Sequence, residues 1–155
     1  MRVTESYRNS SFNLIQMNKG CYIANTLWLA MTIYLVEDDT IYAEFIKKSL
    51  SGDGHVFSVF HSAEEALTEL QKALPEVLII DYKLPGISGI DLYEKIKPRL
   101  KEENKVIMLS SLEDGNMVLN FIQRGVRDYV IKDENVVDSL QAVLNGSEDD
   151  YYLFN

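Results

Sequence analysis

The amino-acid sequence predicts an α/β fold: a doubly wound, five-stranded parallel sheet with helices on both faces, giving a three-layer (βα)5 sandwich. From Met31 onward, short apolar runs alternate with helical stretches five times over. The runs lack polar alternation, which is typical of strands buried on both faces of a parallel sheet. Successive strand–helix units join through right-handed crossovers, so helices are expected on both sides of the sheet.

Five short apolar runs are the predicted strands. Four of them end at a residue that can bind phosphate or a hard metal ion, and the second is followed by a helix start signal. The predicted strands are Met31–Val36, Val56–Phe60, Val77–Ile80, Val106–Leu109 and Asp128–Ile131.

The segments between the strands have helical periodicity and recognisable ends. In the first helix we assign four apolar residues to one buried stripe: Ile41, Phe45, Ile46 and Leu50. Ser62-Ala63-Glu64-Glu65 is a capping box that begins the second helix, and Pro98 should end or kink the third. Gly125 suits the position just after the fourth helix. The predicted helices are Thr40–Leu50, 62–73, Asp91–Leu100, a helix from Asp114 or Gly115 to Gly125, and Asn135–Leu144.

The composition is that of one ordinary domain with a real hydrophobic core. The chain has 155 residues, of which 46% are hydrophobic, and a formal net charge of −9. Such an acidic chain is not expected to present a binding surface for nucleic acid or an anionic membrane. Cys21 is the only cysteine, which excludes an intrachain disulfide and fits a cytoplasmic protein.

The strand–helix repeat predicts a domain over residues 31–146, with an N-terminal extension over 1–30 and a C-terminal tail over 147–155. Cys21–Met31 is fairly apolar and follows a basic residue, so a signal peptide is the alternative for this end. Asn25 and Thr26 interrupt that segment, and it is too short to span a membrane. We therefore favour Met31 as the natural start of the domain.

Acidic, hydroxyl and ammonium side chains follow the strands where each one ends. The carboxyl ends of parallel strands meet at one edge of the sheet, and ligands bind there. Glu37 and Asp38 should therefore lie beside Asp81, and like charges that close together need a cation. Carboxylate oxygens are ligands that Mg²⁺ prefers, while Ser110 and Lys132 can contact a phosphoryl group.

Three further residues near these strand ends have structural interpretations. Asp39 is expected to cap the following helix, and His55 and His61 are expected to be structural or surface residues. Asp81 stands alone at the end of the most apolar strand, where a carboxylate can serve as a metal ligand, a nucleophile or both.

Four segments together resemble the receiver domain of response regulators in two-component signalling. They are Leu35–Asp39, Ile80–Gly89, Met108–Ser111 and Gly125–Lys132. They occur in the expected order within the range from Met31 to about Gly146. The resemblance implies a flavodoxin-like fold and a regulator that accepts a phosphoryl group rather than a true enzyme.

The resemblance also implies a role for each acid. Asp81 would be the phosphoacceptor, taking the phosphoryl group from a phosphohistidine on a sensor histidine kinase or a phosphotransfer protein. Glu37, Asp38 and Asp81 would bind Mg²⁺ together with the backbone carbonyl of Lys83.

The remaining site residues would respond to phosphorylation. Lys132 would contact a phosphoryl oxygen, Ser110 would follow the phosphoryl group, and Tyr129 would change its rotamer with Ser110. The helix–strand–helix region over 113–144 would then present a changed surface to a downstream protein partner or to a second copy in a dimer.

Two departures from the family pattern affect the expectations. The family usually has proline after the lysine, whereas this chain has Asp133, which leaves the loop conformation open. Lys83 and Leu112 occupy the positions that set the phosphoryl lifetime, and neither is suited to position a hydrolytic water. We therefore predict slow self-dephosphorylation.

Three alternatives remain at this stage. A receiver could serve as an interaction module without phosphorylation. An aspartate-nucleophile phosphatase would need a second acid two residues after Asp81, where this chain has Lys83. A flavin-binding module would need a phosphate-binding loop after the first strand, where Glu37, Asp38 and Asp39 would repel phosphate.

Overall fold

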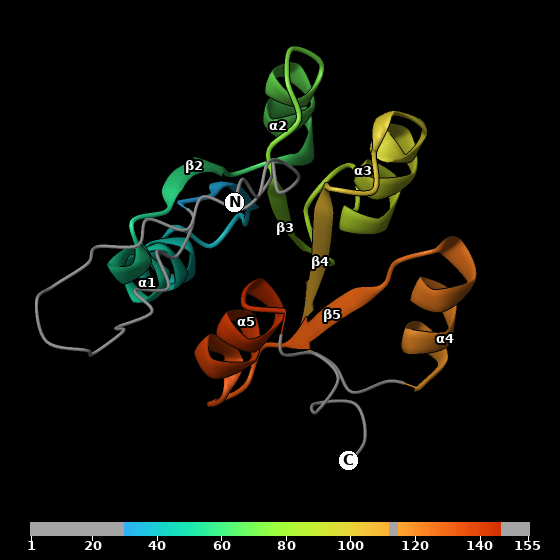
Figure 1. Cartoon of the computed structure of the whole chain (residues 1–155). Helices are drawn as coiled ribbons and strands as arrows, with labels where there is room; N and C mark the ends of the chain where they lie inside the picture. The colour runs from blue at the N-terminus through green and yellow to red at the C-terminus, as the bar shows by residue number, and fades with distance from the viewer. Residues whose placement is uncertain (1–29, 112–114, 147–155) are drawn as a thin grey trace, which may run out of the picture.

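A computed structural model describes residues 30–111 and 115–146 of the chain. Its five strands form one parallel sheet in the order β2-β1-β3-β4-β5, which confirms the predicted doubly wound fold (Figure 1). The strands are β1 (Thr32–Val36), β2 (Val56–Phe60), β3 (Val77–Asp81), β4 (Lys105–Ser110) and β5 (Asp128–Ile131). The predicted extension and tail lie outside the described residues, so those two boundaries stay predictions.

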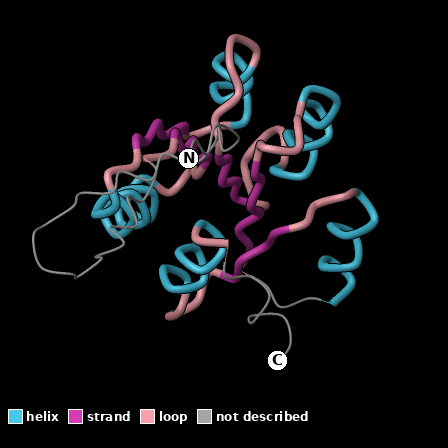
Figure 2. Tube along the Cα trace, viewed as in Figure 1, coloured by secondary structure: helices cyan, strands magenta, loops and turns pink. Residues whose placement is uncertain are grey.

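Five α-helices complete the three layers. Two of them, α1 and α5, cover one face of the sheet, and α2, α3 and α4 cover the other (Figure 1). In Figure 2 the magenta strands lie between these two sets of cyan helices. The helices are α1 (Thr40–Leu50), α2 (Ala63–Leu70), α3 (Gly89–Ile96), α4 (Gly115–Arg124) and α5 (Val136–Leu144). None of the helices in the described ranges has the length and hydropathy needed to cross a membrane.

The sheet separates two hydrophobic cores. Alternate residues of β3 point to opposite faces, so Val77 and Ile79 join the core beneath α1 and α5, while Leu78 and Ile80 join the core beneath α2, α3 and α4. Every residue of β3 is buried. The continuous apolar runs in the sequence therefore reflect burial on both faces, as predicted.

The predicted buried stripe of α1 is partly wrong. Ile46 and Leu50 are buried together with Ala43, but Ile41 is 82% exposed and Phe45 is 47% exposed. The four predicted residues form two pairs, each spaced by four positions, and such pairs lie on one helix face. Residues 43, 46 and 50 follow the spacing of a single stripe, whereas Ile41 and Phe45 lie on the other side of the helix.

Two helices end earlier than predicted. The second helix ends at Leu70 rather than near Ala73, and beyond it Lys72 N–H donates to the Glu69 carbonyl in a tighter turn. After α3, Lys97–Arg99 forms a short 3₁₀ helix that contains Pro98, which has no N–H to continue the α-helical pattern. Gly125 ends α4 as predicted, with a φ of 89° that favours glycine.

Gly89 allows α3 to begin directly against the end of β3. A Cβ atom on Gly89 would lie 2.1 Å from the Asp81 carbonyl oxygen, which is backbone and cannot move aside easily. We expect Gly89→Ala to lower the free energy of unfolding by about 2 kcal/mol, measured by urea denaturation. Gly52→Ala is the matched control, because a Cβ there meets nothing within 4 Å. An equal, small effect of both substitutions would contradict the steric explanation.

Candidate functional site

Backbone hydrogen bonds hold the residues just beyond the strands in line with the sheet. Glu37 N–H donates to the Phe60 carbonyl at 2.9 Å, and Lys132 N–H donates to the Ser110 carbonyl at 2.8 Å. The register pairs Val36 with Ile80 and Ile80 with Met108, so the ends of β1, β3 and β4 lie at one level. The predicted convergence of functional groups at the carboxyl edge of the sheet follows from this register.

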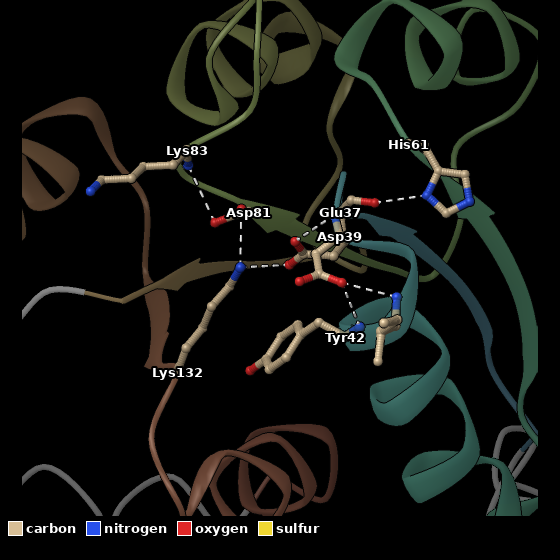
Figure 3. Close-up of polar contacts among 8 residues, drawn as sticks. Glu37, Asp39, Tyr42, His61, Asp81, Lys83 and Lys132 are labelled. Carbon is tan, nitrogen blue, oxygen red and sulfur yellow. Dashed lines mark hydrogen bonds and ion pairs between the residues drawn. The ribbon is translucent and has the colours of Figure 1, made fainter.

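An ion cluster lies at that edge (Figure 3). The Lys132 Nζ atom lies 2.6 Å from Glu37 Oε2 and 3.0 Å from Asp81 Oδ2. The Glu37 side chain is 1% exposed and that of Lys132 is 15% exposed. One ammonium group therefore neutralises part of the charge of two buried carboxylates, one just beyond β1 and one at the end of β3.

Three carboxylates at this edge of the sheet could hold a metal ion. Glu37, Asp38 and Asp81 each offer an oxygen, and these oxygens all lie within 4.8 Å of one another. Glu37 and Asp81 are buried, whereas Asp38 is exposed and gives access from solvent. A set of hard oxygen donors with an open side suits Mg²⁺, which keeps several water ligands when bound to protein.

Lys83 contributes its backbone rather than its side chain to this edge. Lys83 N–H donates to Asp81 Oδ1 at 3.2 Å. Its exposed side chain extends away from the carboxylates in Figure 3. The ammonium of Lys83 is therefore not part of the cluster.

Burial raises the pKa of Glu37 above its ordinary value of 4.5, and the negative charge of Asp81 adds to the effect. The hydrogen bond from Lys132 acts in the opposite direction and does not cancel it. A carboxyl group with a raised pKa binds more protons in the native state than in the unfolded state. Its ionisation therefore lowers stability as the pH rises above about 4.5.

We expect Glu37→Gln to raise the free energy of unfolding by about 1 kcal/mol at neutral pH without metal. The substitution removes one of the two buried negative charges, so that the Asp81 carboxylate alone is paired with the Lys132 ammonium. The gain should appear as the pH rises above the ordinary pKa of Glu37 and vanish below it. Chemical denaturation between pH 4 and pH 8 would measure it. The same variant should bind Mg²⁺ more weakly. A gain that did not depend on pH would contradict this explanation.

Neighbouring residues fix the backbone that carries Glu37. Asp39 caps α1 as predicted, with its Oδ1 accepting hydrogen bonds from the N–H groups of Ile41 and Tyr42. The ring Nδ1 of His61 lies 2.9 Å from the Glu37 carbonyl oxygen, which makes Nδ1 the protonated nitrogen of that ring. The structural interpretation of His61 is thus supported, although its position beside Glu37 was not anticipated.

The predicted switch residues lie on the α4 side of the site. The buried Ser110 hydroxyl donates to the Met117 Sδ atom at 3.3 Å. The half-buried ring of Tyr129 packs against Phe121 with 6.4 Å between ring centroids. Phe121 also packs edge-to-face against Tyr82 at 5.3 Å. These contacts connect α4 to the end of β4, to β5 and to the loop after β3.

Sequence reasoning missed Tyr42. Its ring centroid lies 4.7 Å from the Lys132 Nζ atom, so an aromatic face adjoins the ion cluster. An aromatic residue in the first turn of a helix that follows the acids was the available signal.

Leu112, the other residue named for phosphoryl lifetime, lies outside the described residues. The loop after Lys132 contains no cis peptide bond, and Asp133 Oδ1 accepts a hydrogen bond from Asn135 N–H.

Comparison with known proteins identifies related sequences. The family described as "Response regulator receiver domain" matches residues 33–144. The phosphate regulon transcriptional regulatory protein PhoB of Rhizobium meliloti is 32% identical over 64% of this chain and 44% of its own length. The transcriptional regulatory protein AfsQ1 of Streptomyces coelicolor is 30% identical over 76% of this chain and 52% of its own length. The chain thus spans about half the length of these relatives.

Solved structures show the same similarity. The receiver domain of the Francisella response regulator 1452 has a TM-score of 0.67 and 25% identity, covering 78% of this chain and 98% of that one. The BeF3-activated DrrB receiver domain has a TM-score of 0.67 and 28% identity, covering 77% of this chain and 99% of that one. Both matches take in almost the whole of the compared chain.

Proposed function

Because the chain belongs to the response regulator receiver domain family, we propose that it accepts a phosphoryl group on Asp81 from a phosphohistidine of a sensor histidine kinase or phosphotransfer protein. The observation that carries the proposal is the ion cluster, in which one ammonium lies within 3.0 Å of both the Asp81 and Glu37 carboxylates. A receiver that served only as an interaction module would have no use for this buried charge.

The chemistry follows from the groups at the carboxyl edge. An Asp81 carboxylate oxygen attacks phosphorus, the bond between phosphorus and the histidine nitrogen breaks, and the nitrogen keeps the electron pair. Lys132 offsets charge on the transferring oxygens, because its ammonium already lies 3.0 Å from Asp81 Oδ2. The Lys83 N–H at Asp81 Oδ1 holds the carboxylate in one orientation for in-line attack.

The carboxylates of Glu37, Asp38 and Asp81 would hold Mg²⁺, joined by the Lys83 carbonyl. The bound ion would supply positive charge for the phosphoryl oxygens. The three side chains fit this role because their oxygens lie within 4.8 Å of one another and one of them is exposed.

The proposed output begins at Ser110. Moving the Ser110 hydroxyl from Met117 to a phosphoryl oxygen exchanges a weak thioether acceptor for a charged one. Tyr129, which packs on Phe121, would then take a new rotamer, and α4, β5 and α5 would present an altered surface. We propose a protein, either a downstream partner or a second copy, as the occupant of that surface.

We propose that phosphorylation takes place in the cytoplasm, because the relatives are regulators of transcription.

A direct test uses the whole chain, a small phosphodonor and intact mass spectrometry. We expect a gain of one phosphoryl group with Mg²⁺ and little or none after the metal is chelated. No gain under either condition, with a folded protein, would contradict phosphoacceptor function and favour an interaction module. A gain without Mg²⁺ would contradict the role given to the three carboxylates.

The lifetime of the phosphoprotein is a separate prediction. The exposed Lys83 extends away from Asp81, so it does not hold a water for attack on the phosphoryl group. We therefore expect slow self-dephosphorylation, followed by intact mass after removal of the phosphodonor. A half-life of seconds would contradict the prediction.

A further inference from the structure

The Lys132 ammonium lies between two carboxylates and an aromatic ring. The carboxylates of Glu37 and Asp81 contact it at 2.6 and 3.0 Å, and the centroid of the Tyr42 ring lies 4.7 Å away (Figure 3). A cation within about 6 Å of a ring centroid is attracted by the negative face of the ring. Tyr42 therefore makes a third favourable contact with the ammonium, and this contact uses neither carboxylate.

The ring of Tyr42 is held in place from several directions. Its backbone N–H donates to the Asp39 side chain at 3.0 Å, which fixes the first turn of α1 beside the end of β1. The ring centroids of Tyr42 and Phe45, both on α1, lie 6.0 Å apart. The Tyr42 side chain also packs against the core beneath α1 and α5. The partly exposed Phe45 thus supports the ring that contacts Lys132.

The hydroxyl group does not explain the position of Tyr42. Within the described residues its oxygen is buried and has no hydrogen-bond partner. The hydroxyl of Tyr93, in contrast, donates to the Gly125 carbonyl at 2.8 Å. Burial, together with the charges of Glu37, Asp81 and Asp133, raises the pKa of Tyr42 to about 12, so the ring stays neutral. The aromatic face is therefore the part of Tyr42 that serves the site.

We propose that Tyr42 is a positioning residue whose ring face keeps the Lys132 ammonium beside Asp81 during phosphoryl transfer, an inference that rests on the proposed function. Both carboxylates contacted by Lys132 are also groups that the reaction needs. When Glu37 and Asp81 bind other ligands, the Lys132 ammonium loses its contacts with the two carboxylates but keeps its contact with the Tyr42 ring. The ring thus limits how far a flexible lysine can move from the reacting oxygen.

The test compares three tyrosine variants in the Mg²⁺-dependent phosphorylation assay. Tyr42→Leu removes the ring and keeps an apolar side chain, and we expect phosphorylation to slow by about tenfold. Tyr42→Phe keeps the ring and should restore the rate to within about twofold of the wild type. Tyr34→Leu, a half-buried tyrosine in the opposite core, is the control and should leave the rate unchanged. Equal rates for Tyr42→Leu and Tyr34→Leu would overturn the proposal.

A double-mutant cycle separates positioning from a structural effect. If Tyr42 acts through Lys132, adding Tyr42→Leu to Lys132→Met should slow the residual rate no further. A tenfold loss that persists in the Lys132→Met background would overturn the proposal.

An NMR measurement detects the contact without any phosphorylation. Ring current should shift the Lys132 ε-methylene protons in the wild type and in Tyr42→Phe, and the shift should disappear in Tyr42→Leu. Absence of the shift in the wild type would overturn the inference alone. A wild type that showed the shift but gained no phosphoryl group would overturn the proposed function, and the positioning role with it.

Discussion

Asp81→Asn is expected to abolish the gain of a phosphoryl group. The substitution keeps the size of the side chain and its hydrogen bond from Lys83 N–H, which reaches Oδ1 at 3.2 Å. It removes the carboxylate that we propose attacks phosphorus, and an amide cannot replace such a nucleophile. Loss of a nucleophile commonly costs several orders of magnitude in rate, so labelling should fall below detection by intact mass spectrometry.

Asp39→Asn is the matched control for this experiment. Asp39 also lies beyond a strand end, that of β1, yet its side chain caps α1, and asparagine caps helices about as well as aspartate. The control should therefore be phosphorylated like the wild type. Equal labelling of Asp81→Asn and Asp39→Asn would reject Asp81 as the phosphoacceptor.

Lys132→Met should cause the largest loss of stability among the single-residue changes considered. Methionine preserves an unbranched apolar stem, but the Glu37 and Asp81 carboxylates would lose the ammonium that lies 2.6 and 3.0 Å from them. Removing one partner of a buried ion cluster leaves uncompensated charge, and we expect the free energy of unfolding to fall by about 4 kcal/mol at neutral pH without metal. Urea denaturation would measure this loss.

Two conditions should reverse part of that loss. Without the ammonium, the buried Glu37 carboxyl group loses the contact that opposes its raised pKa, so the deficit should shrink as the pH falls toward the ordinary carboxyl range. Added Mg²⁺ should also reduce the deficit, because it supplies positive charge to the same oxygens.

Lys72→Met is the control for the loss of a lysine ion pair. Lys72 contacts Glu69 at 2.7 Å, but its side chain is 66% exposed, and such pairs contribute about 0–1 kcal/mol. A loss of the same size in Lys132→Met and Lys72→Met would contradict the account of the cluster.

The parts of the structure that could be predicted from sequence depend on short-range pattern and on strand direction. Continuous apolar runs identified β1 and β3, and parallel pairing then placed every strand end at one edge. Glu37, Asp81 and Lys132 therefore meet because each directly follows a strand or ends one. Asp39 could be assigned to the cap of α1 because its position before the helix is itself the signal.

The parts that could not be predicted depend on how each helix is rotated against the sheet. Ile41 and Phe45 carry the same four-residue spacing as Ile46 and Leu50, so the sequence offers two candidate faces for α1, and packing selects one. The same rotation places Tyr42 beside Lys132. The contact between Ser110 and Met117 likewise depends on the placement of α4, which no local pattern specifies.

The division of the interior into two cores means that the proposed phosphorylation site borders both of them. A change in the packing of α1 or α5 affects mainly the core on their own side of the sheet, because the strands separate the two cores. The sheet ends at its carboxyl edge. There Lys132 contacts Tyr42 on the side of α1 and α5, and Ser110 contacts Met117 on the side of α4. A phosphoryl group on Asp81 would therefore lie close to residues of both cores, whereas a mutation inside one core changes mainly the packing of that core.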